Sequence, residues 1–347
     1  MISIHTIELT MEKSYKEFQF QLSSAYKKAK GHHRLGSKKK YNDDNIKVDE
    51  ALGKSGITIE YHNHKYRKQI KVIVNPSKLL GGNDIKIWNP TLRNIEDFLE
   101  LLNEYLEQYF NYDYELNDFQ LTRIDFTSNL NVGEKYVSEY IATLHKLGKV
   151  KYFKPKYDKS YFSKHPEVKK TSFDLIGKTN HIGFSIYDKE ADLISRQKHD
   201  LAKKAKGILR AEVRLSKRPV IETTLEYLNT HTNLTTEEEF TILTLNCIPI
   251  FLKWFGYIVP CGDFHTLKKA LTIVENSDLK KPKKKKMTNL LNLIPEKKSL
   301  YLAEKELNAK NMDEIRNCFV NLNLSPITIS KDKKISYLPN LYQYLDE

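Results

Sequence analysis

The chain has 347 residues, of which 40% are apolar and 29% are charged, and its formal net charge is +13. This length allows two domains of ordinary size, and the excess of Lys and Arg favours a polyanionic partner, either nucleic acid or an acidic membrane. Three features argue against a membrane-spanning or secreted protein. No apolar run reaches the roughly 18 residues of a spanning helix, the first residues lack a signal pattern, and the three cysteines are scattered and odd in number. We therefore expect a cytoplasmic protein.

The first part of the chain is predicted to alternate between strands and one long helix. A strand is expected over residues 2–9, and the polar, basic stretch over 21–50 is interpreted as a loop that is mobile or faces DNA. Residues 56–62 and 68–74 alternate apolar and polar side chains around a polar turn, which predicts a β-hairpin. Apolar residues at helical spacing then predict a helix over 94–110.

The middle of the chain adds three predicted strands and two predicted helices. The strands cover residues 121–130, 181–189 and 208–215, because each alternates apolar and polar residues. A helix with one apolar side is expected over 134–147, and a polar helix over 188–205. From about residue 236 the pattern becomes mainly helical, and the apolar run CIPIFLKWFGYIV fits a buried helix.

Two segments near the C-terminal end carry weaker patterns. The lysine run over 280–286 is interpreted as a solvated linker, with an arm that contacts DNA as the alternative. A predicted helix and two strand-like segments suggest a winged-helix-like module that binds duplex DNA; they cover residues 313–322, 325–330 and 334–338. Together the elements predict an α+β fold, with a mainly antiparallel sheet and flanking helices over 1–235 and a mostly helical domain over 236–347.

Three of the predicted strands carry charge on one face. Side chains alternate between the two faces of a strand, so an apolar face and a charged face can coexist. The strand LTRIDFTSNL is unusual because Asp is depleted in strands and neither charge is easily buried. The residues on the charged faces are Arg123 and Asp125 in the first strand, Tyr187 and Lys189 in the second, and Arg210, Glu212 and Arg214 in the third.

If the three strands lie in one sheet with these faces aligned, Asp125, Tyr187 and Glu212 converge. Two carboxylates suit a hard divalent cation such as Mg²⁺ or Mn²⁺. A tyrosine beside such an ion can act as a nucleophile, and the surrounding Arg and Lys side chains suit phosphate. The pattern therefore indicates phosphodiester chemistry on nucleic acid. The alternative is an ordinary solvated sheet face with a cross-strand Arg–Glu pair.

The chain also resembles the replication initiator endonucleases of filamentous phages, which nick duplex phage DNA to start rolling-circle synthesis. The similar segments occur in the order of the family and cover most of the chain. They are KVIVNPSKLLGG, the TRID of the strand above, FSIYDK, LRAEVRL followed by Lys217 and Arg218, and IRNCFVNLNLSP. Plasmid rolling-circle initiators and some conjugative relaxases share a TRID-like strand and an RxExR-like strand.

The resemblance implies a function and a set of partners. Tyr187 matches the nucleophile, which attacks the scissile phosphate and becomes joined to the 5′ end, while the freed 3′-hydroxyl primes synthesis. The domain over 1–235 would nick and rejoin DNA, with origin duplex and single-stranded DNA as partners and a host helicase and polymerase as further candidates. A mobilisation relaxase with the same chemistry and a non-catalytic DNA-binding replication or regulatory protein are the alternatives.

Residue roles follow from the charged faces and from one basic, aromatic stretch. Between residues 148 and 170, Tyr and Lys are interleaved, which suits stacking on bases and contact with phosphates of single-stranded DNA, or equally an exposed loop. The H-x-H pattern of His62 and His64 lies in a predicted turn and is a weaker metal candidate. We assign Tyr187 and Lys189 to catalysis, Asp125 and Glu212 to the metal, and Arg123, Arg210, Arg214, Lys151, Tyr152, Lys154, Lys156 and Tyr157 to phosphate or DNA binding.

Overall fold

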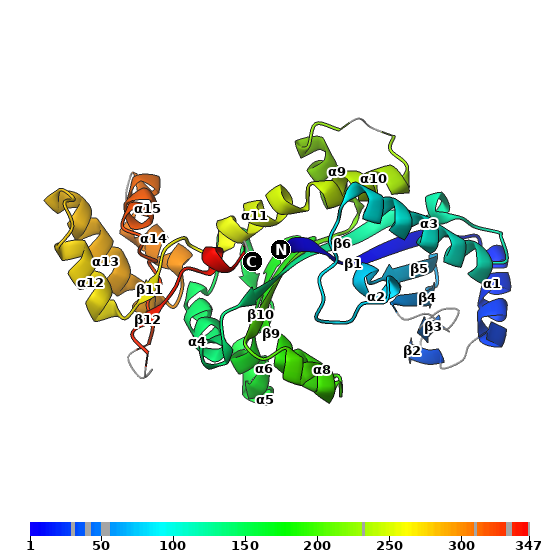
Figure 1. The fold of residues 1–347 in the computed structure, drawn as a ribbon, viewed down its shortest axis with the longest axis horizontal. Coiled ribbons are helices and arrows are strands. Elements are labelled where there is room, and N and C mark those ends of the chain that lie inside the picture. The colour runs from blue at the N-terminus through cyan, green and yellow to red at the C-terminus, as the bar shows by residue number, and fades with distance from the viewer. Residues whose placement is uncertain are drawn as a thin grey trace. The chain divides into compact units, whose positions relative to one another are not determined.

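Figure 1 shows the computed structural model of the chain, which describes residues 1–28, 32–38, 43–49, 56–230, 233–308, 311–330 and 335–345. Two compact units are present. The N-terminal unit comprises residues 2–127 and 214–250, and the C-terminal unit comprises Met1, 128–213 and 251–347. The predicted boundary between residues 235 and 236 divides the chain differently and stays a prediction.

The N-terminal unit is built on an antiparallel sheet with the strand order β2-β3-β4-β5-β1-β6-β10. The predicted hairpin is confirmed as β4 paired with β5, and the predicted first strand is confirmed as β1, which pairs with the other side of β5. Strands β6 and β10 each run on into the C-terminal unit. The strand bounds are β1 Ile2–Glu12, β2 His32–Lys38, β3 Asp43–Asp49, β4 Ile57–Asn63, β5 Lys68–Val74, β6 Gln120–Asn131 and β10 Ile208–Ser216.

The predicted loop over residues 21–50 is wrong where the structure describes it. Helix α1, Tyr15–Lys28, extends into this stretch, and β2 and β3 follow it. Strand β3 buries Ile46 and Val48 on alternate positions, which is the ordinary signal of a strand with one covered face. The polar composition concealed this signal, since strands near the edge of a sheet tolerate charged side chains. Residues 29–31, 39–42 and 50 lie outside the described residues.

Helices and an aromatic cluster cover the sheet of the N-terminal unit. The predicted helix over 94–110 is confirmed as α3, which buries Phe98 and Leu102 on its apolar face. Phe98 packs against Trp88 and Phe240 with ring centroids 5.4 and 5.2 Å away, so α3 and α10 share one core. The remaining bounds are α2 Pro76–Leu79, α3 Leu92–Tyr109, η2 Leu116–Asp118, α9 Arg218–Tyr227 and α10 Thr236–Leu245.

The C-terminal unit also contains a sheet, with the strand order β6-β10-β9-β8-β7. The predicted strands over 181–189 and 208–215 are confirmed as β9 and β10. They are joined by β8, an unpredicted strand that buries Phe173 and Leu175 at alternate positions. The predicted polar helix over 188–205 is two short helices, because Gln197 between them adopts a left-handed conformation with φ of 59°. The bounds are β7 Phe153–Pro155, β8 Ser172–Gly177, β9 Ile182–Asp188, α4 Glu134–Leu144, η3 His145–Leu147, α5 Lys159–Lys164, α6 Pro166–Thr171, α7 Lys189–Ser195 and α8 His199–Lys204.

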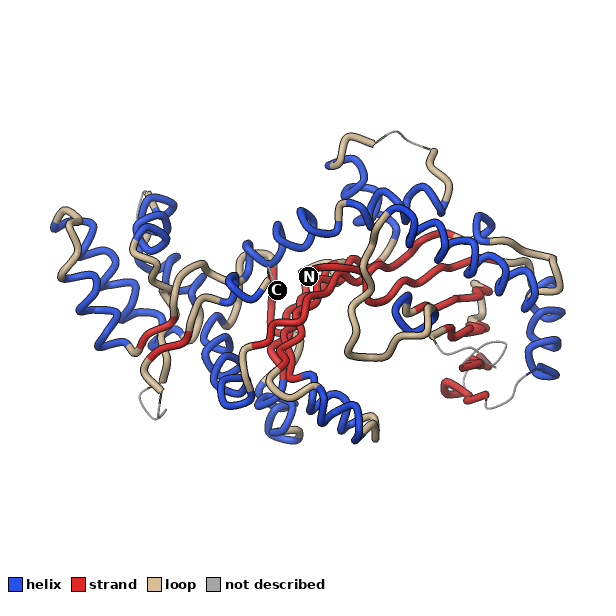
Figure 2. The backbone as a smooth tube through the Cα atoms, in the orientation of Figure 1, coloured by secondary structure: helices blue, strands red, loops and turns tan. Residues whose placement is uncertain are grey.

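The last part of the C-terminal unit is mostly helical, as predicted and as Figure 2 shows. Its core is formed by α13 residues such as Leu290 and Ile294 together with Phe319 of α15. The interpretation of residues 280–286 as a linker is wrong, because these lysines open α13 on its exposed side with Pro282 in the first turn, where its fixed φ is compatible with a helix. The bounds are α11 Cys247–Ile258, α12 Leu267–Glu275, α13 Lys281–Lys297, α14 Leu300–Leu307, α15 Met312–Asn321, η4 Leu341–Tyr344, β11 Phe264–His265 and β12 Tyr337–Leu338.

The predicted winged-helix-like module is represented by α15 and one short strand pair. Helix α15 confirms the predicted helix over 313–322, and β12 pairs antiparallel with β11. Between residues 325 and 330 the described backbone makes one isolated bridge, from Ile329 to Thr266. The DNA-binding interpretation stays a prediction. No single helix in the described part of the chain is long and apolar enough to cross a membrane; α10 and α11 reach that length and composition only together, as a bent pair.

Candidate functional site

Strands β9 and β10 bring the candidate nucleophile and a carboxylate together within the C-terminal unit. Both strands bury apolar side chains on one face, with Ile186 on β9 and Val213 on β10 fully covered. Because the two strands are neighbours in the sheet, the residues that alternate with these apolar positions meet across them. Tyr187 and Glu212 therefore lie on the same face of the sheet, as the sequence predicted.

The central contact of this face is a hydrogen bond between a phenol and a buried carboxylate. The Tyr187 Oη donates to Glu212 Oε1 over 2.7 Å, and Glu212 is only 8% exposed. Burial, followed by the negative charge of Glu212, raises the pKa of the Tyr187 phenol well above its ordinary value of 10, and the positive charge of Arg210 opposes this shift. At neutral pH Tyr187 is therefore a neutral phenol whose proton points at a carboxylate.

A buried ammonium group lies beside the phenol. Lys189 is the first residue of α7, whose N-terminus is capped by the Asp188 carboxylate. The fully buried Lys189 Nζ donates to Asp192 Oδ2 over 2.7 Å and lies 5.7 Å from the centroid of the Tyr187 ring. Burial, together with the positive charge of Arg210, lowers the pKa of Lys189 from its ordinary 10.5 to about 8. Its charge is therefore lost within the range of mildly alkaline buffers.

A second buried cation is held by the neighbouring strand. Arg210 on β10 is fully buried, and its Nε donates to Asn129 Oδ1 of β6 over 2.8 Å. No role was assigned to Asn129 or Asp192 from the sequence. Asn129 shares the strand face of Asp125, because side chains alternate with a period of two residues, and Asp192 lies one helical turn after Lys189. Both polar partners could have been found from that spacing.

The charged face in the N-terminal unit is an ion-pair cluster. Asp125 is 1% exposed and accepts hydrogen bonds from the guanidinium groups of Arg123 and Arg214. The Nε atoms lie 2.8 and 3.1 Å from Asp125 Oδ1, and the Nη2 of each arginine contacts Oδ2. The TRID strand thus carries a carboxylate whose negative charge is compensated by two cations.

These surroundings do not fit a metal ligand at Asp125. Both of its oxygens already accept from guanidinium groups, and two positive charges in contact with the carboxylate disfavour a further cation. Among the described residues, no group of three or more His, Cys, Asp or Glu side chains could hold a metal ion. Glu212 belongs to the C-terminal unit and Asp125 to the N-terminal unit, so each is described with its own neighbours. The assignment of the two carboxylates to Mg²⁺ or Mn²⁺ stays a prediction.

The alternative histidine pair lies where the sequence predicted a turn. His62 lies at the end of β4, and the backbone of His64 exchanges hydrogen bonds with Arg67 to close the hairpin. The two rings lie 5.9 Å apart, and His62 Nε2 lies 2.9 Å from Glu60 Oε2. This contact with His62 is the main reason why the pKa of Glu60 is lowered. The role of the pair in metal binding stays a prediction.

The basic, aromatic stretch places rings and lysines on the surface. Tyr152 is 57% exposed, and the ammonium groups of Lys151 and Lys178 lie 5.2 and 5.6 Å from its ring centroid. Tyr157 stacks on Tyr161 with ring centroids 4.3 Å apart. Lys154 and Lys156 are exposed. Lys178 joins this group through folding alone, because it follows β8 and no local pattern links it to Tyr152.

One comparison with known proteins identifies a family. A family model described as the N-terminal part of a phage replication-associated protein matches residues 35–236, which is more than half of the chain. The match includes Tyr187, Lys189 and Glu212 as well as the Arg123, Asp125 and Arg214 cluster. No curated protein matches the chain.

We expect the Asp125 cluster to stabilise the fold, whatever its part in the reaction. In Asp125→Ala, two partly buried guanidinium groups lose their counter-charge, which should lower the free energy of unfolding by about 2 kcal/mol. This value is below the cost of breaking a fully buried pair because both arginines are partly exposed. Urea unfolding followed by circular dichroism measures the change. Glu100→Ala, at an exposed position of α3, is the control. An Asp125→Ala protein that is as stable as the parent but inactive in Mg²⁺ would instead favour the metal role.

Proposed function

The chain belongs to the family of this phage replication-associated protein, the replication initiators of filamentous phages, and from this premise we propose that it nicks and rejoins one strand of origin DNA through Tyr187. The observation that carries the proposal is the 2.7 Å hydrogen bond from the Tyr187 phenol to Glu212. A strand break made through a tyrosine conserves the phosphodiester as a phosphotyrosine, which allows the same strand to be rejoined later.

In the proposed reaction Glu212 is the proton acceptor. The raised pKa of Tyr187 means that free phenolate is scarce at neutral pH, so attack needs a base within hydrogen-bond reach. The Glu212 carboxylate takes the phenol proton while Tyr187 Oη attacks the scissile phosphorus. The bond from phosphorus to the 3′ oxygen breaks, that oxygen leaves and takes up a proton from water to become a 3′-hydroxyl, and the 5′ phosphate remains bonded to Tyr187.

Two buried cations support the developing charge. The positive charge of Arg210 acts to lower the pKa of Tyr187. The Lys189 ammonium lies 5.7 Å from the centroid of the Tyr187 ring. Negative charge grows on the phosphoryl oxygens during transfer, and fixed cations in a covered site stabilise it more effectively than cations in water. The predicted requirement for Mg²⁺ or Mn²⁺ stays part of the proposal, and chelation with EDTA during a nicking assay tests it.

The partners follow from the same chemistry. Origin duplex is the substrate and the nicked circle is the product. A host helicase and polymerase would act on this circle, and unwinding then exposes the single strand. A mobilisation relaxase would use the same phenol and carboxylate, and only the DNA sequence that is cut distinguishes it. A DNA-binding regulator without catalysis would not use the Tyr187 hydroxyl. Removal of that hydroxyl therefore distinguishes the regulator from a nicking enzyme.

The first test removes the proposed nucleophile. Tyr187→Phe lacks only the hydroxyl, so we expect the protein to fold and to bind origin DNA as the parent does, but to form neither a nick nor a covalent protein–DNA adduct. Supercoiled origin plasmid and a denaturing gel measure both products. Tyr112→Phe removes the hydroxyl of a tyrosine that is 75% exposed and is the matched control. An adduct formed by the Tyr187→Phe protein would show that another residue attacks.

The second test removes the proposed base. Glu212→Gln keeps the size of the side chain and can still accept from the phenol, but an amide cannot take up the proton. We expect the single-turnover nicking rate to fall by about 100-fold or more with little change in DNA affinity. A rate within a factor of about two of the parent rate would exclude Glu212 as the base, since such a change is far below a general-base contribution.

The third test uses the lowered pKa of Lys189. Because this pKa is about 8, the ammonium is charged below pH 8 and neutral above it. If the charge supports catalysis, the nicking rate at saturating DNA should fall with a midpoint near pH 8. Arg keeps its charge far above this pH range, so the nicking rate of Lys189→Arg should not fall near pH 8. Circular dichroism checks that this variant folds. A parent rate that stays constant from pH 7 to 9 would contradict the role of Lys189.

A further inference from the structure

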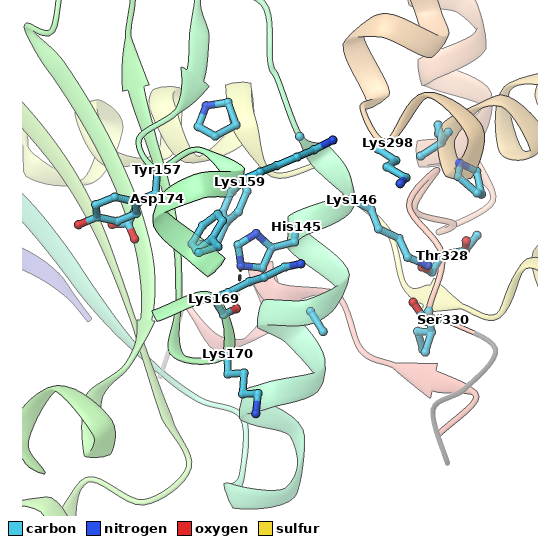
Figure 3. Close-up of a pocket in the computed structure, with 18 of the residues that line it drawn as sticks. His145, Lys146, Tyr157, Lys159, Lys169, Lys170, Asp174, Lys298, Thr328 and Ser330 are labelled. Atoms are coloured by element: carbon cyan, nitrogen blue, oxygen red, sulfur yellow. Dashed lines mark hydrogen bonds between the residues drawn. The ribbon is translucent and has the colours of Figure 1, made fainter. Parts of the chain in front are cut away.

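A large cavity lies within the C-terminal unit, and its lining does not include the residues assigned to catalysis. Its volume is about 1320 Å³. One wall is formed by α4, η3, α5, α6 and β8, and the other by the end of α13 and by residues 328–330. Figure 3 shows lysine side chains that extend from both walls toward the space between them. This lysine groove is lined by Lys146, Lys159, Lys169, Lys170 and Lys298.

We propose that the lysine groove binds single-stranded DNA through its phosphates and bases. The inference rests on the proposed function, because unwinding of the nicked duplex produces a single strand that a groove on the initiator can hold. It deepens that function by assigning the single strand to residues outside the catalytic cluster, and it joins Lys146 and Lys298 to lysines of the basic, aromatic stretch that the sequence indicated.

The lining of the groove carries a net positive charge, because its five lysines outnumber its two aspartates. Lys159, Lys169, Lys170 and Lys298 are exposed, and none of them forms an ion pair with a residue that the structure describes. The two acidic lining residues are engaged elsewhere. Asp158 accepts from the Tyr161 N–H over 2.7 Å to cap α5, and Asp174 accepts from two serine hydroxyls at 2.6 Å each. Solvated lysines that face one cavity favour a chain of phosphates.

Aromatic rings lie among these lysines. Tyr157 lines the groove and stacks on Tyr161 with a centroid distance of 4.3 Å, and a base can stack on a face of such a pair. Phe162 and Phe173 pack edge-on against His145 at 5.7 and 5.6 Å. The combination of rings with point charges suits a single strand, whose bases are free to stack. Duplex DNA hides its bases and would use the lysines alone.

Histidine and backbone contacts hold one lysine in place. His145 Nε2 lies 2.9 Å from the Lys169 carbonyl and 3.0 Å from the Ser172 carbonyl. Since carbonyl oxygens only accept, this nitrogen carries a proton and donates to both. The backbone that carries Lys169 is therefore fixed to η3 at the base of the wall.

The two walls are also fixed to each other. Gly148 adopts φ of +55°, and a Cβ at this position would meet the Lys298 carbonyl oxygen at 2.2 Å, so only glycine allows the close approach. Ser299 Oγ donates to the Lys149 carbonyl over 2.7 Å, and Lys146 Nζ donates to the Thr328 carbonyl over 2.5 Å. A groove that is already formed needs little ordering when a strand binds.

Binding of fluorescein-labelled oligothymidine to the full chain tests the proposal. Lys169→Gln/Lys298→Gln removes one charge from each wall, and we expect about tenfold weaker binding in moderate salt and a salt slope reduced by roughly 0.7 for each phosphate that is no longer neutralised. Lys169→Arg/Lys298→Arg should restore both values. Lys16→Gln/Lys86→Gln removes the same charge from exposed sites in the N-terminal unit and should have little effect. Fluorescence anisotropy over a salt series measures the affinities.

Two outcomes would overturn the inference. In the first, the Lys169→Gln/Lys298→Gln protein binds oligothymidine with the same affinity as the parent protein. The other is an equal loss of affinity for a labelled duplex of the same length, which would assign the groove to duplex DNA. Oligothymidine contains no origin, so binding can be judged apart from nicking. If the parent protein nicks origin plasmid but the double variant binds oligothymidine normally, the groove proposal fails and the proposed function stands. If the parent protein never nicks but the double variant loses oligothymidine binding, the proposed function fails and the groove proposal stands.

Discussion

The hydrogen bond between Tyr187 and Glu212 is the contact on which the proposed chemistry depends. It requires that β9 and β10 be neighbours and that both strands bury their apolar residues on the same side of the sheet. A shift of either strand by one residue would turn its polar side chain to the opposite face. The fully buried Ile186 and Val213 fix this register, because exposing them would cost the hydrophobic free energy of both side chains. The core therefore aligns the phenol with its carboxylate.

The charged side chains of the sheet serve two different purposes. Asp125 is enclosed by the guanidinium groups of Arg123 and Arg214, so its charge is used for structure. Glu212 instead accepts a proton donor, and the cations near the phenol, Lys189 and Arg210, are buried. Asp125 therefore makes ion pairs, whereas Glu212 accepts a hydrogen bond from a neutral phenol. Similar sequence patterns, an acid flanked by Arg on alternate positions, thus give different chemistry.

Local periodicity predicted the elements that carry Tyr187, Glu212 and Asp125, because a covered strand face leaves a signal of period two in the sequence. It failed for β2 and β3, where polar residues mask a short apolar alternation, and for the start of α13, where a lysine run on the exposed side of a helix resembles a linker. Local pattern could not identify both partners of Asp125 either, since Arg214 comes from a strand almost ninety residues away. The sequence indicated only part of the lysine groove. Lys159, Lys169 and Lys170 belong to the basic, aromatic stretch over 148–170, whereas Lys146 and Lys298 join them only through tertiary packing.

A covalent nicking reaction places a physical demand on the rest of the protein. While the 5′ end is bonded to Tyr187, the 3′ end remains free to diffuse, and rejoining needs a strand end to return to the phosphotyrosine. Non-specific phosphate contacts raise the local concentration of a tethered strand without competing for the reacting atoms. The lysine groove meets this demand because it belongs to the same compact unit as Tyr187, uses none of the catalytic side chains, and is rigid through Gly148 and Ser299. Cleavage and retention of the strand would then rest on separate residues of one unit.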